Sequence, residues 1–127
     1  MTYGQIEQEI QLKGLTAPRV TPADIEANIA SEHYFTADEG LIGDRWRYAE
    51  DADDVADNGI PEPLYQLTFC VLVLRNGFTV TGESACASPE NFDAEVGRRI
   101  ARQHAVSKIW PLMGYALRER LAQEAAR

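Results

Sequence analysis

The sequence predicts a single α+β domain in which an antiparallel β-hairpin, or small sheet, packs against C-terminal α-helices, with a short N-terminal helix. Three observations predict it. Residues 64–84 are rich in β-branched and aromatic residues around an Asn-Gly pair. Apolar residues recur every four positions after residue 89. A chain of 127 residues has room for one core of modest size.

The hairpin is expected over residues 64–84. Asn76 and Gly77 both tolerate positive φ, which favours a type I′ turn with a two-residue loop. Such a loop pairs Leu74 with Thr79 and leaves a half-polar face on the opposite side of the hairpin. The face expected to meet the helices consists of Tyr65, Leu67, Phe69, Val71, Val73, Phe78 and Val80.

A kinked helical region is expected over residues 89–123. Ser88 is expected to cap it, and Pro89 suits the first helical position. Pro111 removes a helical N–H and clashes with the preceding turn, so we expect a break near Lys108.

The N-terminal half carries a second helix signal and an acidic segment. Thr21 can cap a helix that starts at Pro22, and we expect this helix to span residues 22–32. Residues 36–63 are polar and acidic and predict a solvated, variable loop. Its Asp51, Asp53 and Asp57 lack the glycine and glutamate offsets of a calcium loop.

Composition argues against several classes of function. A net charge of −8 and a pI near 4.7 disfavour nucleic acid as a partner. No apolar run approaches the length of a membrane span or a signal peptide, so we expect a cytoplasmic protein without a membrane partner. The two cysteines and two histidines lack ligand spacing, and no catalytic motif is present. We therefore expect no catalytic residue, metal or cofactor.

A local basic surface in the last third of the chain can hold a small anion. Residues 82–92 lead from the hairpin into a helix start, where free backbone N–H groups receive phosphates. Arg98 and Arg102 share one helix face one turn later and can clamp a charged ligand together. The alternative is that these arginines pair within the helix, notably with Glu95.

The motifs NGF, ESxC, PxNF and KIW followed by GY resemble a known family. Its members are small phage proteins named after gene forty-nine of phage N-four and gene sixty-six of phage Sf-six. The resemblance covers residues 21–37 and 74–121 but not the acidic segment between them. More distantly, the pattern is similar to the Thoeris anti-defence proteins of the first type, which sequester cyclic ADP-ribose signals and, in some cases, cyclic dinucleotides.

This resemblance implies a non-enzymatic phage protein that binds a cyclic nucleotide without cleaving it. It also implies a homo-oligomer, a dimer or an assembly of dimers, with ligands near protomer boundaries. Arginines would hold phosphates, an aromatic ring would contact the base, and Asn91 would read a base edge or ribose hydroxyl. The predicted ligand-binding residues are Phe78, Glu83, Ser84, Asn91, Phe92, Arg98, Arg99, Arg102, Lys108 and Trp110.

A second hypothesis is that the chain is a small early phage protein that inhibits a host protein by direct contact. The carboxylates of residues 44–57 would then mimic nucleic acid. Under this hypothesis, deleting that segment abolishes inhibition and leaves nucleotide binding intact.

Overall fold

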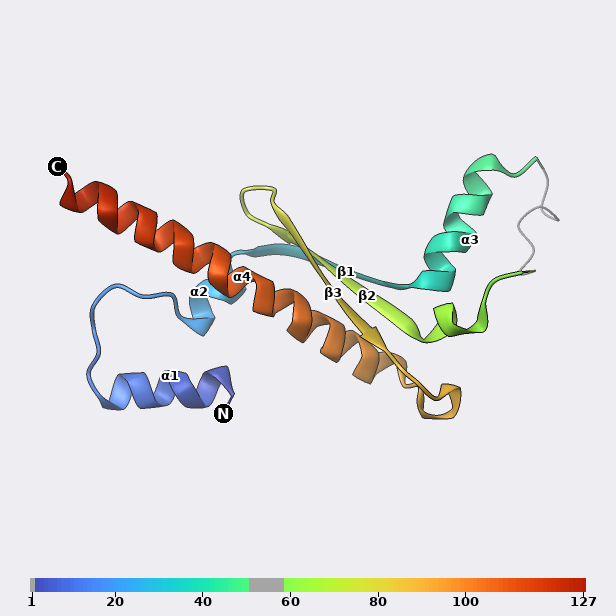
Figure 1. Cartoon of the computed structure of the whole chain (residues 1–127), viewed down its shortest axis with the longest axis horizontal. Coiled ribbons are helices and arrows are strands. Elements are labelled where there is room, and N and C mark those ends of the chain that lie inside the picture. The colour runs from blue at the N-terminus through green and yellow to red at the C-terminus, as the bar shows by residue number, and fades with distance from the viewer. Residues whose placement is uncertain (1, 51–58) are drawn as a thin grey trace.

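The computed structural model describes residues 2–50 and 59–127, and it confirms the α+β class (Figure 1). A three-stranded antiparallel sheet in the order β1-β2-β3 lies beside one long C-terminal helix. In chain order the elements are α1 (Tyr3–Leu12), α2 (Pro22–Ala27), β1 (Ile29–Thr36), α3 (Ala37–Tyr48), the 3₁₀ turn η2 (Glu62–Gln66), β2 (Leu67–Leu74), β3 (Thr79–Ala85), the 3₁₀ turn η3 (Pro89–Asn91) and α4 (Ala94–Ala125).

The predicted helix at Pro22 begins where expected but is shorter. Thr21 and Asp24 form a reciprocal cap, in which each side chain accepts the other residue's backbone N–H at 3.1 and 2.9 Å. The helix ends at Ala27, and residues 29–36 form β1, which pairs with β2. The prediction of a helix over 22–32 is therefore wrong at its C-terminal end, because pairing with β2 outweighs local helix propensity.

The hairpin has a different register from the predicted one. Leu74 donates its N–H to the carbonyl of Phe78 at 2.8 Å, so the loop has three residues and Val73 pairs with Thr79. Gly77 alone in this loop has positive φ, at 91°. A register shift of one residue exchanges the two faces of a strand. On β2 the face that packs against α4 is therefore the alternate set, Thr68, Cys70, Leu72 and Leu74, and not the predicted Leu67, Phe69, Val71 and Val73. On β3, Val80 is buried on this face as predicted.

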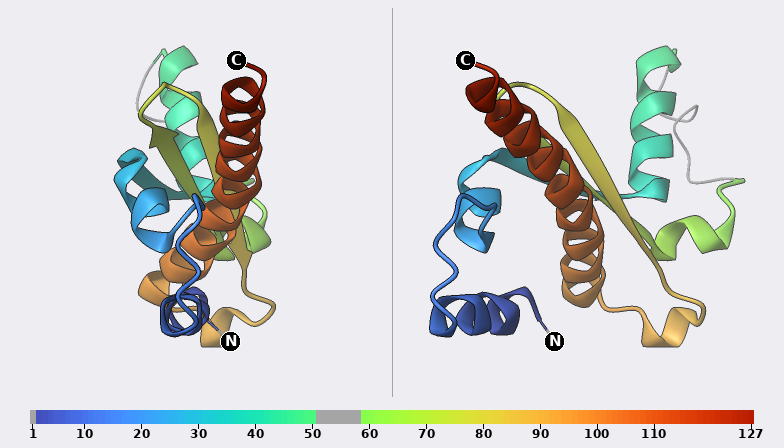
Figure 2. Two further views of the ribbon diagram at one scale, coloured as in Figure 1. Left: turned by 90° about the vertical axis from the view of Figure 1, so that its left-hand side faces the viewer. Right: turned by 60° about the vertical axis from the view of Figure 1, so that its left-hand side comes forward.

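Small residues let α4 lie very close to this face. Gly82 of β3 packs against Ala101 and Ala105, and a Cβ at Gly82 would lie 2.0 Å from the Ala101 carbonyl oxygen. The core consists of the buried apolar residues of the sheet and α4 together with Ile25 of α2. Figure 2 shows α4 along one face of the sheet. On the opposite face Phe69 stacks on Phe35, and their ring centroids lie 5.5 Å apart.

The predicted break at Pro111 is also wrong, because α4 continues through this residue to Ala125. The loss of one helical hydrogen bond is outweighed by packing, since Trp110 and Met113 contact the same core on either side of Pro111. The start differs too. Asp93, and not Ser88, caps α4 by accepting the Val96 N–H at 3.0 Å, and residues 89–91 form η3.

The segment predicted as a loop over 36–63 contains α3. The Glu39 carboxylate accepts hydrogen bonds from the Thr36 N–H and hydroxyl at 3.1 and 2.7 Å, which fixes the first turn. Acidic residues at the start and Arg45 and Arg47 in the last turn complement the helix dipole. Residues 51–58, with the three aspartates weighed as calcium ligands, lie outside the described residues.

No helix among the described residues has the length and apolar character needed to span a bilayer.

Candidate functional site

A groove of about 650 Å³ lies where α2, the hairpin loop and the C-terminal half of α4 meet. Its apolar floor includes Val20 from the arm before α2, and Met113 and Leu117 from α4. Its charged rim holds three arginines, Arg19, Arg75 and Arg120, and one aspartate, Asp24. This is a concentration of positive charge in a chain whose net charge is −8.

Arg75 is held at the rim by the end of α2. Its backbone N–H donates to the Asn28 carbonyl at 3.0 Å, and its side-chain Nε donates to the Ala27 carbonyl. Among the described residues, no carboxylate lies within ion-pair distance of this guanidinium. Two of its nitrogens therefore point from a fixed stem and can donate to an anion.

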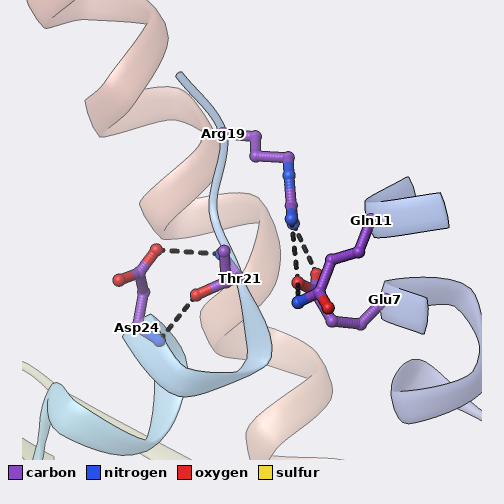
Figure 3. A network of polar contacts seen from close by, with 5 residues as sticks. All are labelled: Glu7, Gln11, Arg19, Thr21 and Asp24. Atoms are coloured by element: carbon purple, nitrogen blue, oxygen red, sulfur yellow. Dashed lines mark hydrogen bonds and ion pairs between the residues drawn. The ribbon is translucent and has the colours of Figure 1, made fainter. Parts of the chain in front are cut away.

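Arg19 forms the wall of the groove that faces α1. Figure 3 shows its guanidinium on the Glu7 carboxylate, with which it makes two hydrogen bonds of 2.5 and 2.8 Å. Gln11 donates to the same carboxylate at 2.8 Å. The hydrogen bond from Arg19 lowers the pKa of Glu7, so this carboxylate stays ionised and balances the charge of Arg19. Arg19 therefore orders the arm more than it attracts an anion.

Arg120 contributes an exposed charge from α4. Its Nε lies 3.7 Å from Glu124 Oε1, and the side chain is 64% exposed. An ion pair of this length between exposed side chains is weak, so a ligand can displace it. Asp24 is already an acceptor in the α2 cap. The surplus positive charge of the groove thus comes from Arg75 and Arg120.

The predicted arginine clamp is arranged differently. The Arg102 guanidinium donates to both Glu26 oxygens, at 2.7 and 3.1 Å, and to Glu32 at 3.1 Å. The hydrogen bonds that Arg102 donates to Glu26 raise the pKa of Arg102 above its ordinary value. Arg102 thus ties α4 to α2 and β1. Arg99 lies 3.9 Å from Glu95, as the alternative of pairing within the helix predicted.

The residues predicted to form one site at the strand-to-helix junction lie in separate cavities. Phe78 and Lys108 line a shallow groove of about 450 Å³ between the hairpin loop and α4. Ser84, Asn91 and Phe92 line a smaller cavity of about 130 Å³ at the junction itself. The Asp93 carboxylate occupies the helix start there, where a phosphate was expected. A carboxylate at that position repels a second anion.

The remaining predicted residues have other neighbours. Glu83 is exposed on β3, and its backbone carbonyl lies 2.7 Å from Nδ1 of His104. Trp110 stacks on Tyr3 of α1 with ring centroids 4.8 Å apart. Arg98 joins Phe92 at a third cavity, between α3 and the start of α4.

Sequence reasoning missed Arg19, Arg75 and Arg120 as candidates, and it expected Arg120→Ala to change binding little. Arg75 had one usable signal, its position directly before the Asn-Gly turn, where a loop side chain is free to meet a ligand. Arg19 had none, because the arm that carries it is placed by its contact with α1. In the described parts of the chain, no three potential metal ligands gather at one point.

The fold and site define a small α+β protein with a basic groove and with no ligand cluster suited to a metal among its described residues. The family model of the phage protein (N4 Gp49/phage Sf6 gene 66) family matches residues 20–121. The chain belongs to this family, as the resemblance predicted. No curated protein and no solved structure matches the chain.

Proposed function

We propose that this phage protein binds and sequesters cyclic nucleotide immune signals in the cytoplasm of an infected bacterium, without cleaving them. The signals would be cyclic ADP-ribose isomers or cyclic dinucleotides. The observation that carries the proposal is the groove with Arg75 and Arg120 at its rim and an apolar floor. Its volume of about 650 Å³ lies within the range of pockets that take small organic ligands.

The chemistry of the groove matches the two halves of such a ligand. Guanidinium groups bind phosphate oxygens through paired, charge-assisted hydrogen bonds. Met113 and Leu117 offer apolar surface to a base or ribose. Among the described residues of the lining there is no histidine, cysteine or serine that could act as a nucleophile or base, and the one carboxylate, Asp24, serves in the α2 cap. These features support binding and retention rather than turnover.

Self-association forms part of the proposal. One sheet face packs against α4, whereas Phe35 on the other face is 37% exposed and Val71 and Val73 are half-buried. Such an apolar surface is typical of a contact between copies. We expect a dimer or an assembly of dimers in light scattering at micromolar concentration. A monomer would remove this part of the proposal.

Filtration tests the sequestration. The protein is mixed with a cyclic ADP-ribose isomer, separated from free ligand by filtration and then denatured by heat. We expect the nucleotide to be released unchanged, with the intact mass of the added ligand. Recovery of a cleaved product would make the protein an enzyme and contradict the proposal.

Inhibition of a host protein is the second candidate, and α3 favours it. Trp46 is 59% exposed and Tyr48 is 73% exposed on this helix, and aromatic residues are enriched at protein interfaces. Replacing both with alanine should abolish inhibition under this candidate while cyclic nucleotide binding in the groove persists. Unchanged inhibition would remove it.

A further inference from the structure

A cavity of about 180 Å³ lies at the other end of the sheet, where α3, the start of β2 and the start of α4 converge. Its lining combines aromatic rings, hydroxyls and charged groups: Phe35, Thr36, Asp38, Glu39, Tyr65, Thr68, Phe92, Ala94 and Arg98. About seven residues of β2 separate it from the basic groove, or about 20 Å of strand. One small ligand therefore cannot occupy both.

Two buried acceptors line this cavity without a partner. Asp38 is 8% exposed, and its Oδ1 has no hydrogen-bond partner among the described residues. The same holds for Oγ1 of Thr68, which is 2% exposed. Buried polar atoms are normally paired, and an unpaired charged one is the more costly. Each of these two atoms therefore needs a hydrogen-bond donor, and the described residues do not supply one.

The charge of the lining is negative. Asp38 and Glu39 carry two carboxylates, and Arg98 carries one guanidinium, which leaves one negative charge in excess. The Thr36 hydroxyl is the main cause of a lowered pKa at Glu39, so that carboxylate is ionised at neutral pH. Three aromatic side chains, Phe35, Tyr65 and Phe92, line the same space.

We propose that this cavity binds the ammonium group of a small primary amine. A primary ammonium supplies three N–H donors, which suit Asp38 Oδ1 and Thr68 Oγ1. Its single positive charge balances the excess negative charge, and aromatic faces attract a cation. Water can pair both oxygens, but it adds no positive charge to the partial charge that the start of α3 offers Asp38 and Glu39.

The site is independent of the proposed nucleotide groove and needs no change there. It also gives Phe92 and Arg98 a new setting. Arg98 was predicted to hold an anion and Phe92 to contact a base, but here both lie beside two carboxylates. The positive charge of Arg98 would then repel the ammonium group, so removing Arg98 should strengthen binding instead of weakening it.

Titrations of the full chain with n-butylammonium chloride and with butan-1-ol, followed by NMR at constant ionic strength, test the proposal. We expect the amine to bind at least tenfold more tightly than the alcohol of similar shape. Asp38→Asn should weaken amine binding at least tenfold, whereas Arg98→Ala should strengthen it several-fold by removing a like charge. The groove variant Arg75→Ala should bind the amine as the wild type does.

Thr68→Val adds a control that separates ligand binding from folding. Valine keeps the shape of threonine and removes an unpaired hydroxyl, so this variant should melt at or above the wild-type temperature while binding the amine more weakly. Equal affinity for amine and alcohol would show a cavity that holds water only and overturn the proposal. Weaker amine binding by Arg98→Ala would overturn it as well.

Discussion

Gly82→Ala tests the packing that holds the whole fold. The added Cβ would lie 2.0 Å from the Ala101 carbonyl oxygen and 2.4 Å from the Ala105 nitrogen, whereas ordinary contacts begin at 3.4 Å. Both neighbours are backbone atoms of α4, so no side-chain rotation can relieve the overlap. The helix must move away from β3 by about 1.4 Å, the difference between 3.4 and 2.0 Å. Close-packed cores resist such shifts.

This displacement opens the core between the sheet and α4, where Leu72 and Ile109 are fully buried. Overpacking of this kind costs about 1–3 kcal/mol and occasionally more. Because the clash involves rigid backbone, we expect a loss of about 3 kcal/mol or no cooperative unfolding at all. Urea denaturation followed by circular dichroism measures the change.

Gly114→Ala is the control. Gly114 lies on α4, the helix that Gly82 contacts, and a Cβ there meets nothing within 4 Å. It should be neutral or stabilise by up to about 1 kcal/mol. A Gly82→Ala variant within about 0.5 kcal/mol of the wild type would refute the packing argument, since that is the usual scatter of surface changes.

Three further predictions concern the polar and aromatic contacts. Arg102→Ala should cost about 1–2 kcal/mol in urea denaturation, because it removes charge-assisted bonds to two partly exposed glutamates; no loss would mean that these contacts do not hold α4 to α2 and β1. The hydrogen bond from Arg102 lowers the folded-state pKa of Glu26, so its contribution is present above the unfolded pKa and is lost as the pH falls through the folded pKa. The stability gap between the wild type and Arg102→Ala should therefore narrow in thermal melts between pH 6 and pH 3, and a gap independent of pH would contradict this assignment. Tyr3→Ala removes the ring stacked on Trp110 and should shift tryptophan emission to the red, with a loss of about 0.5–1.5 kcal/mol; an unchanged spectrum would place α1 elsewhere.

Much of the architecture follows from local signals in the sequence. The cap at Thr21 and the position of the hairpin each rest on neighbouring residues, and each was predicted correctly. The apolar repeat correctly predicted a helix, but its Val96 and Ile100 are exposed, and the small residues Gly97, Ala101 and Ala105 pack on the sheet instead.

The hairpin register was not predicted correctly. The pair Asn76-Gly77 suits a two-residue loop and also the end of a three-residue loop, and the two loops give strand pairings that are shifted by one residue. The close contact of Gly82 with α4 favours the second, and sequence alone does not reveal that contact.

Elements that depend on distant partners were missed. β1 forms because β2 offers a free edge, and its own residues Ala30, Ser31 and Glu32 do not favour a strand. The helix α4 passes through Pro111 because the core holds both sides of it.

The candidate site shows the same limit. Arg19, Arg75 and Arg120 lie far apart in the sequence and meet only after α2, the hairpin loop and α4 have packed together. Arg102 looked available from its helical position, whereas its two glutamate partners lie about 70 residues earlier in the chain. Periodicity within one helix can predict a pair such as Arg99 and Glu95 but not a contact of that range.

The most direct test of the proposed function is calorimetric titration of a cyclic ADP-ribose isomer into the wild type and four variants. Arg75→Ala and Arg120→Ala should each weaken binding roughly tenfold to hundredfold, because each removes a guanidinium worth about 1.5–3 kcal/mol to a phosphate. Arg118→Ala removes a charge from the same helix outside the groove and should change affinity little. Asn91→Ala removes the amide predicted to bind the ligand at the strand-to-helix junction, and it should also change affinity little. The account predicts losses at Arg75 and Arg120 alone. Wild-type affinity in both of these variants would contradict it, and a loss confined to Asn91→Ala would return the site to the strand-to-helix junction.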